Sequence, residues 1–172
     1  EQVSFGSSLP FFIIQAIGFF GWIFTGFSAA AVATAIFLYF GRMLAITAFY
    51  HRYFSHKSFQ IVAEEKTFLH AALELLFGCA AMTSLQRSVL WWAYWHRRHH
   101  QDADTPVDVH SPHDLGFWWA HVGWILCDKY HVIPPDKLDK LKKEFPSLAW
   151  SERGYAHVIP AVCLAVLCTW VG

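Results

Sequence analysis

Charge is scarce in this sequence, and neither sign dominates. Only 15% of the 172 residues are charged, and 13 basic residues balance 13 acidic ones. A nucleic-acid partner is therefore not expected, because proteins that bind nucleic acids carry a basic surface. Disorder is excluded as well, since 55% of the residues are hydrophobic and offer ample surface to bury.

Cysteine is also scarce. The four cysteines show no CxxC spacing, so the sequence indicates neither a zinc knuckle nor a disulfide framework. We expect all four to be small buried hydrophobic side chains, and they are Cys79, Cys127, Cys163 and Cys168. What the chain has in excess is aromatic residues, at 18%, and histidine, with 11 residues.

Lys and Arg are absent from the first 41 and the last 19 residues. Between Leu9 and Gly41 no residue is charged at neutral pH. A single helix over this run would be about 50 Å long, against about 30 Å of hydrocarbon in a bilayer. We therefore predict two transmembrane helices, at about 8–25 and 29–50, that form a hairpin with its turn at residues 25–28. The alternative, a secretory signal peptide, is disfavoured because the run is too long and no basic segment precedes it.

The rest of the chain divides into a polar middle and a second apolar end. Residues 51–154 hold nearly all the cations, and the positive-inside rule places them in the cytosol. Residues 155–172 are expected to begin a further transmembrane helix, truncated by the end of the sequence. The expected fold is an all-α integral membrane protein with a single, partial domain, made of a transmembrane hairpin (8–50), a cytosolic helical cap and this last span. Arg42 would lie in the hairpin, where it must face protein or the interface.

Helical periodicity recurs in the polar middle. Phe68–Met82, Val89–His100 and Pro134–Phe145 are each predicted to form a helix. His70 and Glu74 lie four residues apart on the first of them, and we interpret the two as an intrahelical pair on a polar face. The third helix has a narrow apolar stripe between lysines, which is typical of a helix that lies on a surface.

Two groups of histidines carry the strongest chemical signal. On a helix, His96, His99 and His100 span an arc of about 100°, so their rings can converge on iron, copper, nickel or zinc. His51 and His56 would lie about 140° apart on an ideal helix, so they share a site only where the helix ends or is distorted. Arginines beside both groups would repel protonated rings, which favours neutral imidazoles bound to a metal.

The other histidines give weaker signals. His110 and His113 flank Pro112, which argues against a regular helical metal face there. We expect ordinary core or surface roles for the isolated histidines, which are His70, His121, His131 and His157.

Tryptophan clusters beside the second histidine group and again about 20 residues later. Two interpretations stay open: an aromatic belt at a membrane interface, or the lining of a site for a long apolar substrate. The candidate substrate-binding residues are Trp91, Trp92, Trp95, Trp118 and Trp119.

The segments around the histidines resemble the membrane fatty-acid desaturases, nearest the delta-nine acyl-CoA (stearoyl-CoA-type) group. Residues 46–59, ITAFYHRYFSHKSF, are similar to the first histidine box of that family, HxxxxH, with its flanks. Residues 90–100, LWWAYWHRRHH, are similar to the second box, HxxHH, and residues 104–124 to the segment after it. The likeness runs from about residue 8 to 170, and a third HxxHH box is absent.

The resemblance implies a di-iron enzyme that uses O2 and an external electron donor, a ferredoxin or cytochrome-b-type protein. Its product would be a cis double bond, of delta-nine type, in a long-chain fatty acyl group. The residues that match iron ligands are His51, His56, His96, His99 and His100. Five histidines cannot saturate two irons, so the chain is expected to be a piece of a longer protein and inactive alone.

Several points stay open. Animal acyl-CoA members carry Arg-Asp where this chain has Tyr94 and Trp95, so both acyl-CoA and acyl-lipid substrates are considered. Residues 108–112, DVHSP, resemble bacterial members more than animal ones, which favours a bacterial inner membrane over the endoplasmic reticulum. The alternatives are a membrane di-iron hydroxylase of alkyl or sterol substrates and an inactive, truncated metal-binding relative. A zinc hydrolase is disfavoured, because its HExxH motif is absent.

Overall fold

The computed structural model describes residues 3–62 and 67–171. These residues are helical or in turns, and their one extended pairing is an isolated antiparallel bridge between Val3 and Cys127. The predicted all-α class is therefore confirmed. The chain forms two compact units, which we call the first unit (residues 3–33 and 98–132) and the second unit (residues 34–97 and 133–171).

The first unit begins with the apolar segment that was predicted at 8–25. Helix α1 (Phe5–Phe20) is separated at Gly21 from the single turn α2 (Trp22–Thr25). Gly26 follows with φ 74°, a left-handed conformation that glycine adopts without steric cost. The helical structure is thus interrupted within residues 25–28, and the hairpin predicted there stays a prediction.

The remainder of the first unit is a run of short helices. Ser111 caps α6 (Pro112–His121), which is kinked at Gly116, and the 3-10 turns η2 (Gly123–Leu126) and η3 (Asp128–Tyr130) follow. Two bonds to the Leu126 carbonyl, from the Ser4 amide at 3.0 Å and the Ser8 hydroxyl at 3.3 Å, join the start of α1 to η2.

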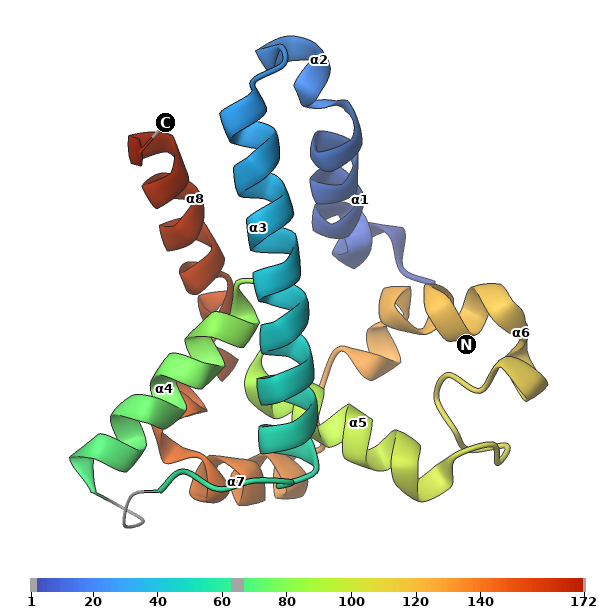
Figure 1. Cartoon of the computed structure of the whole chain (residues 1–172). Helices are drawn as coiled ribbons and strands as arrows, with labels where there is room; N and C mark the ends of the chain where they lie inside the picture. Colours follow the sequence, from blue (N-terminus) through green and yellow to red (C-terminus); the bar gives the residue numbers. More distant parts are fainter. Residues whose placement is uncertain (1–2, 63–66, 172) are drawn as a thin grey trace. The chain divides into compact units, whose positions relative to one another are not determined.

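A long helix enters the second unit. Helix α3 (Ala29–Ala45) continues without a break into a π-helix, η1 (Ile46–Ser55), as Figure 1 shows. These 27 residues form the one described helix that is long and apolar enough to cross a membrane. The helix extends five residues beyond the predicted end at 50 because the π-helical segment continues it. A second, broken candidate joins residues 146–152 and 156–170 with a bend of 107°.

Helices α4 (Phe68–Met82), α5 (Val89–Asp102) and α7 (Pro135–Glu144) lie at or within two residues of the predicted bounds. In the second unit α4 packs on the 3-10 helix η4 (Pro146–Glu152), which leads through η5 (Ala156–Val158) to α8 (Ile159–Val171). The close approach depends on Gly78, because a Cβ there would lie 2.4 Å from Cδ2 of the fully buried Leu148.

The interpretation of Glu74 as part of a polar surface pair with His70 is wrong. Glu74 is buried, and its carboxylate accepts hydrogen bonds from the hydroxyls of Ser147 at 2.5 Å and Tyr53 at 3.4 Å. The reason is tertiary: η1 and η4 both pack against α4, and they supply these two hydroxyls.

The prediction for the cysteines is correct only in part. Cys127 is buried and Cys79 and Cys168 are half-buried, but Cys163 is exposed. Cys163 lies on α8, where Val162 and Leu167 are exposed as well. Such an uncovered apolar surface is typical of a helix that faces lipid rather than a protein core.

Candidate metal centre

The π-helix η1 carries the first pair of histidines. The His56 amide donates to the His51 carbonyl at 3.0 Å, an i→i+5 bond. Because this bond closes a wider turn than in an α-helix, residues five apart come to lie about one turn apart. The ring centroids of His51 and His56 are accordingly 4.6 Å apart, with the planes at 80°. The helix distortion that a shared site for His51 and His56 requires is therefore present.

His96 on α5 joins this pair within the second unit. Its ring centroid lies 4.7 Å from that of His51 and 5.1 Å from that of His56. The Nε2 atoms of His56 and His96 are 3.1 Å apart, and each residue of the three has a ligand nitrogen within 4.8 Å of the others. We call His51, His56 and His96 the histidine trio; a set of imidazole nitrogens suits a first-row transition metal such as iron.

Trp92 holds one side of the trio. Its ring stacks on His96, with centroids 4.6 Å apart, and on Tyr50, at 5.3 Å. The Tyr50 hydroxyl is in turn fixed by a 2.6 Å bond to the Arg87 carbonyl. This stack restricts the rotation of the His96 ring.

The other four tryptophans of the predicted substrate site occupy different environments. Trp91 and Trp95 are buried in the second unit. In the first unit Trp118 is exposed, and Trp119 donates its indole N–H to the Val109 carbonyl at 3.1 Å. Trp92 therefore contacts the trio through the His96 ring, and substrate binding by all five tryptophans stays a prediction.

His99 belongs to a second cluster, within the first unit. Its Nδ1 lies 2.9 Å from Oδ1 of Asp108, whose side chain is completely buried. The Asp108 carboxylate also accepts from the amides of Asp104 at 3.1 Å and His110 at 3.2 Å. Burial alone would raise the pKa of Asp108, but the hydrogen bonds from His99 and the two amides outweigh it and lower this pKa. Asp108 is therefore an anion at neutral pH.

His110 completes this cluster. Its ring stacks on His99 with centroids 4.0 Å apart, and each residue of the set His99, Asp108 and His110 has a ligand atom within 4.8 Å of the others. Burial, and then the proximity of His99, lowers the pKa of His110, which keeps the ring neutral. The proline at position 112 argued against His110 as a ligand, and no role is predicted for Asp108 from the sequence. Both lie in a turn after α5, where no helical period marks them.

His100 lies on the last turn of α5. Its ring centroid is 5.4 Å from that of His99. It follows His96 by four residues along the same helix, and residues at this spacing share a helix face.

Comparison with known proteins finds several desaturases. The chain is 35% identical over 131 residues to the sn-1 stearoyl-lipid 9-desaturase of Anabaena variabilis, covering 76% of this chain and 44% of that protein. It is 29% identical over 143 residues to acyl-CoA desaturase 1 of Tachysurus fulvidraco, covering 81% of this chain and 40% of that protein. The match to delta-9 acyl-lipid desaturase 1 of Arabidopsis thaliana is 33% over 106 residues, 62% of this chain and 32% of that protein. The chain thus spans less than half the length of these relatives, and no family model or solved structure matches it.

Proposed function

We propose that this chain, because it belongs to the family of acyl-CoA and acyl-lipid desaturases, forms the part of a di-iron desaturase that holds the first two histidine boxes. The whole protein would use O2 to introduce a cis double bond, of delta-nine type, into a long-chain fatty acyl group. The observation that supports this proposal is the histidine trio, which unites residues 40 positions apart in the sequence around a common centre.

The donor set fits iron, because it consists of imidazoles. In the proposed centre the trio would hold one iron, and His100, which follows His96 by four residues along α5, is proposed as a further iron ligand. His99 would ligate the second iron through Nε2, since Nδ1 faces Asp108. The remaining ligands of this second iron would come from outside the chain, where the relatives extend beyond it.

Bound iron would supply the O2 activation that removal of hydrogen from an unactivated methylene requires. The residues of this chain would keep the ligands neutral and oriented. Asp108 holds the His99 ring by accepting from Nδ1, which fixes the tautomer and raises the basicity of the opposite nitrogen. Trp92 limits the rotation of His96 by stacking.

The substrate would be an acyl-CoA or an acyl-lipid, as the names of the relatives indicate for those proteins. We propose that the aromatic residues Trp91, Trp92, Trp95, Trp118 and Trp119 line the path of its chain. The electron donor would be a ferredoxin or cytochrome-b-type protein. The two apolar segments would form a hairpin in the bilayer, of a bacterial inner membrane in our proposal, with residues 51–154 on the cytosolic side and residues 155–172 entering the membrane again.

The test is to express the complete protein that contains this chain and to measure its iron content and its fatty acid products. We expect His51→Ala and His96→Ala to lose iron and to stop double-bond formation. His70→Ala on α4 is the matched control and should change neither. Unchanged iron and product in both trio variants would refute the proposal, and an alcohol product would identify the hydroxylase alternative. The chain alone is expected to form no double bond; two bound irons with turnover would contradict that expectation.

A further inference from the structure

An arginine of α5 is bound to the end of the π-helix that carries the first histidine pair. The Nε atom of Arg97 donates to the Ser55 carbonyl at 3.1 Å, and Nη2 donates to the Phe54 carbonyl at 2.5 Å. The last carbonyls of a helix lack partners within the helix, so these bonds satisfy two groups that would otherwise need water. Arg97 follows His96 directly, and Ser55 precedes His56 directly. One side chain therefore links the backbone beside both histidines.

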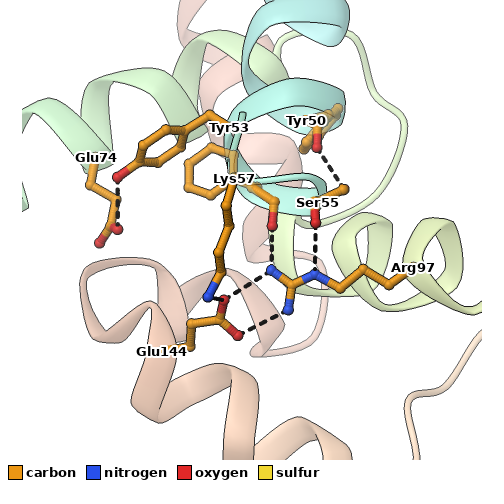
Figure 2. A network of polar contacts seen from close by, with 8 residues as sticks. Tyr50, Tyr53, Ser55, Lys57, Glu74, Arg97 and Glu144 are labelled. Carbon is orange, nitrogen blue, oxygen red and sulfur yellow. Dashed lines mark hydrogen bonds and ion pairs between the residues drawn. The ribbon is translucent and has the colours of Figure 1, made fainter. Parts of the chain in front are cut away.

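A carboxylate of α7 fixes this arginine. Oε2 of Glu144 accepts from Nη1 of Arg97 at 3.0 Å, and Oε1 accepts from Nη2 at 2.9 Å. Such a two-bond fork orients a planar guanidinium more strictly than a single ion pair does. Figure 2 shows the guanidinium of Arg97 between the end of η1 on one side and Glu144 on the other.

Lys57 binds to the same carboxylate. Its Nζ lies 2.7 Å from Oε1 of Glu144. Lys57 has φ 52°, a left-handed conformation that is uncommon for residues other than glycine, and its amide donates to the Tyr53 carbonyl at 3.2 Å. The backbone thus leaves the helix at Lys57, immediately after His56. Glu144 binds the side chain of this same Lys57.

We infer that Glu144, Arg97 and Lys57 form a clamp that positions the histidine trio for metal binding. The three are positioning residues, because they hold the backbone and not a ligand ring. The inference rests on the proposed metal centre, and it assigns to α7 a role beyond that of a surface helix. Without the clamp, no single side chain would connect the end of η1 to the residue beside His96, and the distance between the His56 and His96 rings would vary.

The experiment uses the complete, membrane-extracted protein with Co²⁺ as the probe in place of iron. Co²⁺ affinity and the ligand-field absorption of the folded fraction are measured for the parent protein and for Glu144→Gln. We expect the substitution to weaken Co²⁺ binding about 10–100-fold, as for other residues that orient ligands, and to shift the absorption bands. Asp139→Asn is the matched control, because it removes a carboxylate from an exposed position of the same helix and should bind as the parent does.

A purely structural role would reduce the amount of folded protein but leave the affinity and spectrum of the folded fraction unchanged. Arg97→Lys decides the case if Glu144→Gln does not fold, since it retains the charge and lacks the fork, and it too should weaken Co²⁺ binding. Parent-like affinity and spectrum in the folded variant would overturn the clamp while leaving the metal centre intact. Failure of the parent protein to bind Co²⁺ would instead count against the proposed function.

Discussion

Asp108 offers a sharp test of how the buried polar groups support the histidines. Its carboxylate is fully buried and accepts three hydrogen bonds, from the His99 ring and from the amides of Asp104 and His110. The Asp108→Asn substitution keeps the shape of the side chain but replaces one acceptor oxygen by an NH2 group and removes the charge. The effect on stability and metal binding can therefore be attributed to the hydrogen bonds and charge of the carboxylate rather than to a change in packing.

The expected loss follows from these three bonds. If the amide oxygen takes the place of Oδ1, the bonds from His99 and His110 persist but lose their charge assistance, at about 1 kcal/mol each. The NH2 group then faces the Asp104 amide, donor against donor, and the lost bond costs about 1 kcal/mol more because that amide is near the surface. We therefore expect Asp108→Asn to lower the free energy of unfolding by about 3 kcal/mol. Metal affinity at His99 should fall about 10–100-fold, because the ring loses the carboxylate that fixes its tautomer.

Chemical denaturation in detergent measures the first quantity, and competition with a chromophoric chelator measures the second. The control is Asp104→Asn, which removes a charge four residues away, at an exposed position, and leaves the backbone amide in place. A variant at Asp108 that matches this control in both stability and metal affinity would show that the buried carboxylate neither stabilises the turn nor orients His99.

Three further predictions concern the second unit. Gly78→Ala should lower the free energy of unfolding by about 1–2 kcal/mol, because its Cβ would lie 2.4 Å from Leu148 Cδ2 and the cost of overpacking exceeds the gain in helix propensity. Combined with Leu148→Ala, it should lower the free energy by less than the sum of the two single effects, and a double-mutant cycle measured by chemical denaturation checks this. Glu144→Gln should melt below the parent at pH 7. Burial would raise the pKa of Glu144, but the hydrogen bonds and charges of Arg97 and Lys57 outweigh it and lower this pKa below its usual value. The difference in melting temperature between parent and variant should therefore shrink as the pH falls below about 4.5 and vanish below the folded-state pKa. A difference that does not shrink on acidification would contradict this. If the proposed centre of the complete protein holds iron, its removal with a chelator should lower the melting temperature and added Fe²⁺ should restore it, since a ligand of the folded state alone stabilises that state. An unchanged melting temperature would count against the centre.

Much of this fold follows from local sequence. The bounds of α4 were predicted to the residue, and α5 and α7 to within two, because apolar residues at helical spacing and a proline near the start of α7 are signals carried within each segment. The turn at residues 25–28 was predicted because the apolar run is too long for one span and Gly26 lies within it. The hairpin and the sidedness of the membrane segments remain predictions.

The sequence predicts the π-helix only indirectly: His51 and His56 can share a site if the helix between them is distorted. The five-residue spacing of His51 and His56 required a distortion, but nothing local distinguishes an i→i+5 helix from an i→i+4 helix. Glu74 was misjudged for a related reason. Its spacing to His70 is a surface pattern in an isolated helix, whereas burial came from Tyr53 and Ser147, which lie 21 and 73 residues away. Contacts between residues so far apart in the chain cannot be predicted from a local segment of the sequence.

The carboxylates of Asp108 and Glu144 act at different points of the proposed centre. Asp108 contacts a ring nitrogen of His99, so its removal should change the basicity and tautomer of a ligand. Glu144 acts through Arg97 on backbone carbonyls of η1, so its removal should alter where His56 stands relative to His96 but leave each ring chemically the same. The two substitutions should consequently differ in kind. In the proposed centre, Asp108→Asn should weaken binding of the metal at His99, whereas Glu144→Gln should weaken binding of the metal at the histidine trio, and metal titration of the two variants measures both. Weakened binding of the same metal in both variants would mean that both act on the same property of the centre.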